Sequence, residues 1–253
     1  MSLREFLRPV RIVLVEPSLP ENIGASARAM KTMGLTDLAL VRPKLFPDAR
    51  ASALAAGADD LLEGARVCNS LAEALEGCIH AAGCSARLRD IAVPLQEPAL
   101  AARNLVARMA QGPVALVFGA ERTGLSNEDL GRCHVAVHIP TEPDFSSLNL
   151  AQAVQVLAFS VRNAALEQQG TEALANTRDD APADLGQLER MFGHFEEALS
   201  EIDFFKGRPH GQLMLRIRRM LLRADLDTRE VMILRGILAE AQRMARLAAR
   251  VNN

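Results

Sequence analysis

The chain has 253 residues, enough to bury a sizeable core in one large domain or in one ordinary domain with a smaller companion. Hydrophobic residues make up 49% and charged residues 24%, a globular balance that excludes a wholly disordered chain. The 29 basic and 31 acidic residues nearly cancel, so no overall field indicates a polyanionic partner. The nine Phe, with neither Trp nor Tyr, argue against an RNA surface of stacked rings, and any nucleic acid is expected to be held by charge and shape.

The cysteines and the N-terminus exclude several further classes. The four cysteines form neither a CxxC pair nor a ladder with the five histidines, so we expect no metal site and no disulfide framework. The first eight residues carry three charges and lead directly into a strand-like run, without the apolar core of a signal peptide. No apolar stretch approaches membrane-spanning length. We therefore expect a cytoplasmic protein with no membrane partner.

Short runs rich in β-branched residues are predicted to form the buried strands of a mostly parallel sheet. Helical patterns between them supply the crossovers that parallel strands require. This alternation predicts the α/β class. The strands are expected at residues 10–15, 38–41, 65–68, 79–82, 114–118 and 135–139, and the helices at 23–33, 71–75 and 97–110.

A longer helical pattern follows at residues 150–167, and its apolar face is expected at Val154, Leu157, Val161 and Leu166. Residues 168–183 have no apolar period and read as a linker. Three helices are then predicted at 184–201, 211–223 and 228–251, the last capped by Asp227 or Thr228. The expected organisation is an α/β domain over residues 1–167, a linker over 168–183 and a small all-α domain over 184–253.

Polar loops follow three of the predicted strands, at residues 16–24, 119–126 and 140–149. In parallel sheets, ligands collect beyond the carboxyl ends of the strands, where the N-termini of helices also point their amides. We therefore expect the three loops to form parts of one active site.

The second loop differs from a phosphate-binding P-loop by one residue. Leu125 stands where the P-loop lysine must be, and without that charge the terminal phosphates lose their partner. No GxGxxG motif follows the first strand either. Nucleoside triphosphates and dinucleotides are therefore not the expected ligands.

The polar side chains of these loops also have ordinary interpretations. Asn22 and Ser126 could cap helices, Asn149 could cap the long helix, and Arg28 could be a surface residue. Residues 206–223 contain six basic residues and no Asp or Glu, which fits either a solvated helix face or an RNA contact. These basic residues are Lys206, Arg208, Arg216, Arg218, Arg219 and Arg223.

Taken together, the loops resemble the signature motifs of the SPOUT (TrmH-like) RNA 2′-O-methyltransferases. The matching runs are Asn22-Ile23-Gly24-Ala25-Ser26-Ala27-Arg28, residues 116–125 and residues 146–154. Residues 29–35, 54–58 and 234–238 resemble the branch of that family that methylates the tRNA anticodon loop at nucleotide 32. The resemblance covers nearly the whole chain. It implies a C-terminal trefoil knot in the sheet domain, S-adenosylmethionine as cofactor, a tRNA substrate and a homodimer.

The resemblance also implies where the cofactor is held. In that family the cofactor lies bent in the knot loops, mainly against backbone groups. Ile139 and Leu148 are expected to flank the adenine, and Cys84 to contact the cofactor through its main chain. The implied cofactor-binding residues are Cys84, Ser85, Ala86, Gly119, Ile139, Ser146, Ser147 and Leu148.

Catalytic roles are carried over in the same way, to Arg28, Asn22, Glu121, Ser147 and Asn149. A ribose 2′-hydroxyl is a poor nucleophile, and an arginine can hold RNA phosphate and stabilise the developing alkoxide. Arg28 fills that role, in its own or the neighbouring subunit's site, with Asn22 orienting it or the RNA. Glu121 and Asn149 support the loops and the substrate, and Ser147 bonds the ribose or the cofactor carboxylate. The proton acceptor is left open among Arg28, an RNA phosphate and water.

RNA contacts are expected at Arg122 and at the basic residues of 206–223. The small Ala120 after Gly119 departs from part of the family pattern and could alter RNA contact. Two alternatives are open: a related enzyme that methylates ribosomal RNA, and a non-catalytic RNA-binding relative. The intact Asn22, Arg28, Glu121 and Asn149 speak against the non-catalytic alternative.

Overall fold

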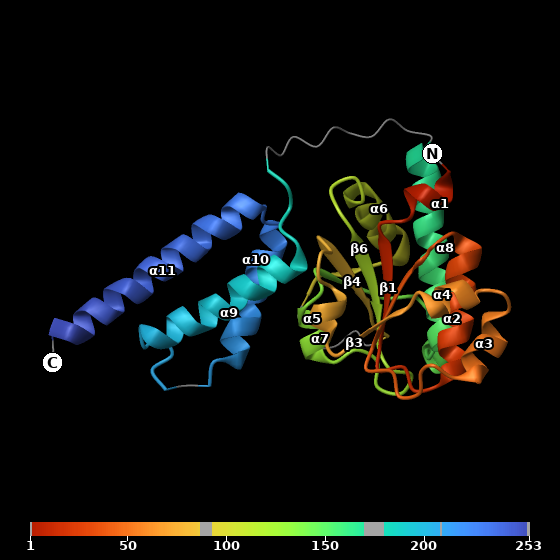
Figure 1. Cartoon of the computed structure of the whole chain (residues 1–253), viewed down its shortest axis with the longest axis horizontal. Coiled ribbons are helices and arrows are strands. Elements are labelled where there is room, and N and C mark those ends of the chain that lie inside the picture. Colours follow the sequence, from red (N-terminus) through yellow and green to blue (C-terminus); the bar gives the residue numbers. More distant parts are fainter. Residues whose placement is uncertain (1, 87–92, 170–179, 208, 252–253) are drawn as a thin grey trace. The chain divides into compact units, whose positions relative to one another are not determined.

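The computed structural model describes residues 2–86, 93–169, 180–207 and 209–251. The chain divides into two compact units, residues 1–176 and 177–253. Within the described residues, the first unit forms a seven-stranded sheet in the order β3-β2-β1-β6-β4-β7-β5. Every neighbouring pair in it is parallel, which confirms the predicted α/β class with a mostly parallel sheet (Figure 1).

The strands coincide closely with the predicted apolar runs, because strands covered by helices on both faces are mainly apolar. In β1 all six residues are buried. The edge strand β5 has only two residues, too few to produce a pattern, and the sequence did not predict it. The bounds are β1 (Val10–Val15), β2 (Asp37–Val41), β3 (Arg66–Cys68), β4 (His80–Cys84), β5 (Leu95–Gln96), β6 (Val114–Phe118) and β7 (Val135–Val137).

Helices cover both faces of this sheet (Figure 1). On one face α2 (Pro20–Met33), α6 (Pro98–Arg108) and α8 (Leu150–Gln169) pack together, with α8 in contact with the other two. The short helices α5 (Leu71–Ala74) and α7 (Asn127–Gly131) lie on the opposite face. Four short elements were not predicted: α1 (Leu3–Phe6), α3 (Ala49–Ala55), α4 (Asp59–Glu63) and the 3₁₀ helix η1 (Pro143–Phe145).

The apolar face of α8 is confirmed in part. Val154, Leu157 and Val161 are buried, but Leu166 is 49% exposed, so its prediction as a core residue was wrong. Ala165 is fully buried instead. Eleven residues complete about three helical turns, so Ala165 returns to the side of Val154 while Leu166 is rotated about 100° further.

The second unit contains three helices within its described residues: α9 (Leu185–Glu201), α10 (Gly211–Ala224) and α11 (Thr228–Val251). Asp184 caps α9, and the carboxylate of Asp227 accepts from the N–H of Glu230 at 2.8 Å in the first turn of α11. Asp227 is thus the cap of the last helix. Helix α8 continues through Gln169, two residues into the predicted linker, and residues 170–179 of that linker lie outside the described residues.

Among the described residues, no helix is both long and apolar enough to cross a membrane.

Candidate active site

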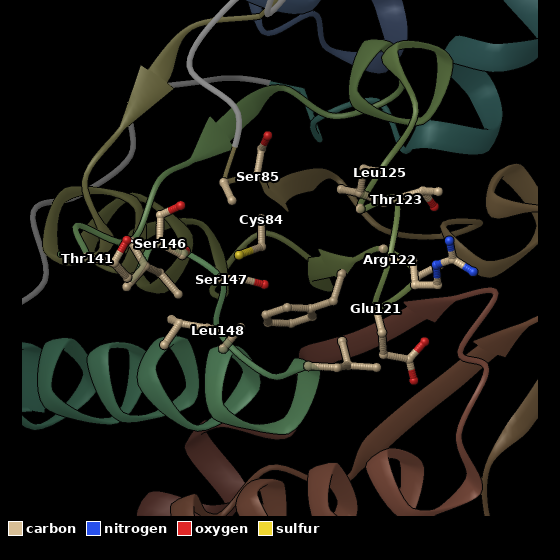
Figure 2. Close-up of a pocket in the computed structure, with 18 residues that line it drawn as sticks. Cys84, Ser85, Glu121, Arg122, Thr123, Leu125, Thr141, Ser146, Ser147 and Leu148 are labelled. Carbon is tan, nitrogen blue, oxygen red and sulfur yellow. Dashed lines mark hydrogen bonds between the residues drawn. The ribbon is translucent and has the colours of Figure 1, made fainter. Parts of the chain in front are cut away.

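A pocket lies at the carboxyl ends of β4, β6 and β7 (Figure 2). The sheet register pairs Gly83 with Val117 and Cys84 with Val137, so the three strands end at one level. The loops that follow them supply the pocket walls. This is the edge of a parallel sheet at which ligands collect.

The structure brings together all the residues predicted to hold a cofactor. The lining joins apolar side chains, such as Ile139 and Leu148, to the hydroxyl groups of Ser146 and Ser147 around a volume of about 190 Å³. Thr123 and Thr141 also line the pocket; the sequence prediction missed them, although they lie in the loops it singled out. The predicted residues in the lining are Cys84, Ser85, Ala86, Gly119, Ile139, Ser146, Ser147 and Leu148.

The loop after β6 folds back sharply on itself. The N–H of Gly124 donates to the carbonyl of Ala120 at 2.8 Å, and a Cβ atom at Gly119 would lie only 2.1 Å from the carbonyl carbon of Gly124. Position 119 therefore has to be glycine for the loop to close. Leu125, which occupies the position of the P-loop lysine, is buried and contributes an apolar side chain to the pocket lining.

A hydrogen-bond network centred on Glu121 joins the three loops. The Glu121 carboxylate accepts from the N–H of Ser18 at 2.9 Å, from its Oγ at 2.6 Å and from the N–H of Leu19 at 3.2 Å. Nδ2 of Asn22 also donates to Glu121, at 2.8 Å. Oδ1 of Asn22 in turn accepts from Nδ2 of Asn149 at 2.9 Å. Glu121 and Asn149 therefore support the loops, and Ser18 joins them as a member that the sequence prediction missed.

The environment of Glu121 excludes it as the proton acceptor. Burial alone would raise its pKa, but hydrogen bonds from Ser18 and Asn22 outweigh burial and lower the pKa to about 2. A carboxylate with so low a pKa is a weak base. Figure 2 also shows the Glu121 carboxylate pointing away from Cys84 and Ser147. Glu121 thus positions the loops rather than taking part in proton transfer.

Two of the three suggested helix caps are present. Oδ1 of Asn149 accepts from the N–H of Ala151 at 2.9 Å in the first turn of α8, and Ser126 caps α7. Asn22 lies inside α2, whose N-cap is Leu19, so its interpretation as a cap was wrong. Asn149 therefore has two roles, since its other amide atom binds Asn22.

Arg28 is exposed on α2 and does not line the pocket of its own chain. Within one chain Asn22 bonds to Glu121 and Asn149 and not to Arg28, so its role in orienting Arg28 or the RNA stays a prediction. The two residues are six positions apart, which places them on different sides of the helix and about 9 Å apart along its axis. No hydrogen bond or ion pair joins Arg28 to any residue that the structure describes, so its guanidinium is available to an external anion.

Neither thiol nor metal chemistry has support in the described residues. Burial raises the pKa of the Cys84 thiol to about 12, which keeps it protonated and unreactive. No group of three or more His, Cys, Asp or Glu side chains among these residues is arranged to hold a metal ion.

The basic residues of α10 divide into two groups. Arg216, Arg219 and Arg223 are exposed and, at spacings of three and four residues, share one face of the helix. Arg218 instead forms a salt bridge with Glu189 of α9 and lies 4.3 Å from the ring centroid of Phe192. Arg218 thus stabilises the contact between α9 and α10, and only the other three present open cations.

The other three residues predicted to contact RNA, Arg122, Lys206 and Arg208, lie outside α10. Arg122 lines the pocket and is exposed, with its side chain turned away from Ser147 (Figure 2). Lys206 is exposed after α9, and Arg208 lies outside the described residues.

The fold and the pocket define an α/β protein that binds its ligand between loops at the ends of three neighbouring parallel strands. Residues 9–159 match the family model described as the SpoU rRNA Methylase family. Residues 186–250 match the model of the tRNA methyltransferase TrmJ, C-terminal domain. The chain therefore belongs to the SpoU methylase family and is a methyltransferase. Its predicted resemblance to RNA methyltransferases is confirmed.

The individual relatives agree with this assignment. Over 238 residues the chain is 45% identical to the tRNA (cytidine/uridine-2′-O-)-methyltransferase TrmJ of Yersinia pestis (strain Pestoides F), covering 94% of this chain and 93% of that one. The crystal structure of TrmJ from Z. mobilis ZM4 is 36% identical, with a TM-score of 0.79, and the match covers 91% of this chain and 97% of that one. The SpoU methyltransferase AviRb from Streptomyces viridochromogenes, solved in complex with the cofactor AdoMet, shares the fold at 20% identity and a TM-score of 0.50, with 62% of this chain and 60% of that one covered.

Proposed function

We propose that the protein methylates the ribose 2′-hydroxyl of a cytidine or uridine in tRNA with S-adenosylmethionine, at nucleotide 32 of the anticodon loop. The TrmJ relatives match the chain along nearly its whole length, and the one from Yersinia pestis is named a tRNA (cytidine/uridine-2′-O-)-methyltransferase. The observation that carries the proposal is the convergence of the eight predicted cofactor residues on one pocket beside the Asn22–Glu121–Asn149 network.

The residues of the pocket fit S-adenosylmethionine. Ile139 and Leu148 offer apolar surfaces to the two faces of an adenine, and Ser146 and Ser147 offer hydroxyl groups to a carboxylate or a ribose. The tight turn at Gly119 leaves backbone groups close to the ligand. When bound, the cofactor supplies a methyl group already activated on a sulfonium.

The protein's own part in the reaction is to position the ribose and to stabilise charge. Arg28 holds an RNA phosphate and stabilises the developing alkoxide through its rigid donor fork. Because Arg28 lies outside the pocket of its own chain and has no partner among the described residues, we propose that it serves the pocket of a second subunit. This requires the homodimer that the sequence resemblance implies, and we extend the proposal to the trefoil knot around the cofactor.

The second unit is proposed to bind the tRNA backbone, as a small all-α domain joined through residues 168–183. Arg216, Arg219 and Arg223 support this role, since three open cations on one helix face match a row of phosphates. The proposed location of the enzyme is the cytoplasm, where it meets its tRNA substrate.

The test is a methylation assay on defined RNAs. Purified protein is incubated with labelled S-adenosylmethionine and with transcripts of tRNA or of ribosomal RNA, and the nucleosides are identified by mass spectrometry. The proposal expects a 2′-O-methylated pyrimidine in the anticodon loop and no label in ribosomal RNA. Label in ribosomal RNA alone would support the function suggested by the description of the family model. Absence of cofactor binding in calorimetry would instead support a non-catalytic relative.

A further inference from the structure

Phe145 is the most exposed large hydrophobic residue in the described part of the chain, with 83% of its surface accessible. It is the last residue of η1 and directly precedes Ser146, which lines the pocket. The N–H of Phe145 donates to the carbonyl of Glu142 at 3.0 Å, and Oγ1 of Thr141 donates to the carbonyl of Ser146 at 3.3 Å. A hydrogen-bonded turn therefore presents an uncovered aromatic ring beside the candidate active site.

No contact within the described residues of the first unit accounts for this ring. Among the described residues, Phe145 is neither part of the pocket lining nor packed against the hydrophobic core. Leaving an aromatic side chain in water forgoes the free energy that its burial would release. The exposure of Phe145 therefore points to a ligand outside the pocket.

The surroundings of Phe145 favour a nucleic-acid base over the other candidate ligands. Its neighbours Asp144 and Ser146 are exposed and polar, whereas a protein interface needs a contiguous apolar centre. The carboxylates of Glu142 and Asp144 would repel RNA phosphates. An uncharged base with a flat π face avoids that repulsion and needs a contact no larger than one ring.

We propose that Phe145 is the platform on which an unpaired pyrimidine of the substrate RNA stacks, so that the ribose of that nucleotide faces the pocket. This inference rests on the proposed function, because methylation inside an RNA loop requires a nucleotide held out of its stack. Proteins that recognise single-stranded loops stack splayed bases on aromatic side chains. The scarcity of aromatic residues excludes a broad stacking surface but leaves room for one ring. Phe145 is thus a positioning residue.

A fluorescence experiment tests the contact directly. The chain has neither Trp nor Tyr, so Phe145→Trp creates a protein with a single indole. We expect tRNA transcript to quench that indole, while a fully paired RNA duplex and the cofactor alone do not. The control is Phe159→Trp, at an exposed Phe of α8 with 52% of its surface accessible, which is expected to be insensitive to tRNA. Unchanged Phe145→Trp emission, with tRNA shown to be bound in a mobility-shift assay, overturns the proposal.

Kinetics test the positioning role. Base stacking on one aromatic ring is worth about 1–3 kcal/mol, so Phe145→Ala and Phe145→Leu are expected to raise KM for tRNA roughly 5- to 150-fold. Phe145→Tyr is expected to restore it. Cofactor affinity by calorimetry and oligomeric state by light scattering are expected to be unchanged. An unaltered KM, or a change of oligomeric state that accounts for the loss, overturns the platform. Quenching by tRNA without any methyl transfer by the wild-type protein leaves the platform standing and overturns the proposed function.

Discussion

At the scale of single residues, the Glu121 carboxylate connects parts of the site that lie far apart in the chain. Its four hydrogen bonds all come from Ser18, Leu19 and Asn22. Glu121→Gln removes the charge and turns an NH₂ group toward these donors. We expect a loss of about 1–3 kcal/mol in the free energy of unfolding, measured in urea, together with slower methyl transfer.

The matched control is Glu128→Gln, because Glu128 is largely exposed and bonds to Arg132 at the surface. The Glu128→Gln variant should unfold like the wild type.

A carboxyl group whose pKa falls on folding stabilises the folded state at pH values above its usual pKa. That stabilisation is lost as the pH falls toward the pKa of the folded state. Since the pKa of Glu121 falls from 4.5 to about 2, the deficit of Glu121→Gln should be constant from pH 8 to about 5 and shrink below that. Equal stability of the two variants would contradict this account.

A second prediction concerns His80, which is buried with its ring centroid 4.4 Å from that of His134. Burial, the neighbouring His134 and Arg108 hold the pKa of His80 well below its usual value of 6.5. The folded protein therefore keeps His80 neutral, while the unfolded chain binds a proton below about pH 6.5. The free energy of unfolding should fall as the pH drops from 7 toward 5, as the proton-linkage relation requires.

Chemical unfolding at several pH values measures this slope. His80→Leu should flatten it, because leucine binds no proton in the unfolded chain. If the free energy of unfolding of His80→Leu changed with pH as in the wild type, a group other than His80 would be responsible for the pH dependence.

At the scale of elements, α2 brings the first motif to the site through close contact with α3. A Cβ atom on Gly24 would lie 1.9 Å from the carbonyl oxygen of Ala51. Gly24→Ala must separate the two helices, which we expect to cost about 1–3 kcal/mol of unfolding free energy and to reduce activity. Gly236→Ala is the control: it lies inside α11 with no atom near the added Cβ, and should gain up to about 1 kcal/mol. Thermal unfolding compares them, and equal effects would contradict the close contact.

Helix α2 also carries Arg28. Because this side chain is exposed, its replacement should affect methyl transfer without affecting the stability of the fold. Arg28→Ala should leave folding and cofactor binding nearly unchanged and should lower methyl transfer to tRNA by about 100-fold or more. Single-turnover assays and calorimetry measure the two effects. Arg103→Ala, at an exposed arginine of α6, should be neutral in both. Full activity of Arg28→Ala would remove its assigned role.

Elements with a long or wholly apolar pattern could be predicted from the sequence, and very short ones could not. The runs that became β1 and β6 matched the structure residue for residue, because burial on both faces leaves a mainly apolar signal that Arg11 of β1 interrupts only once. The edge strand β5 is held by its pairing with β7, and the turn η1 has only three residues, too few to produce a pattern. The same limit applies to Leu166, since an apolar residue type does not reveal which way a helix rotates its face.

At the scale of the whole molecule, the open arginines of α10 make the salt dependence of RNA binding measurable. Replacing Arg216, Arg219 and Arg223 with Gln should weaken tRNA binding and reduce the slope of log affinity against log salt by about 0.7–0.9 for each phosphate that is no longer neutralised. Arg243→Gln is the control, because Arg243 is already paired with Glu240 on α11. A slope unchanged in the triple variant would exclude this face as a phosphate-binding surface.

The candidate site could be predicted only in part, because its loops meet through the fold. The position of each loop after a strand followed from the sequence, as did the residues that line the pocket, through resemblance to a family. The bond between Asn22 and Asn149 spans 127 positions, and no local pattern reveals it. Likewise, the exposure of Arg28 outside its own pocket depends on the rotation of α2 against the sheet.

The network at Glu121 has a direction. The N–H of Ala151 donates to Asn149, Asn149 donates to Asn22, and Asn22 donates to Glu121, so every amide turns its nitrogen toward the carboxylate. An ionised carboxylate can only accept, and this fixes the order of donors back to the start of α8. An Asp at position 22 would place a second acceptor opposite the carboxylate, and a Gln at position 121 would leave one acceptor oxygen where two now accept from four donor groups. The three motifs are therefore coupled through one chain of hydrogen bonds, although they lie in separate parts of the sequence.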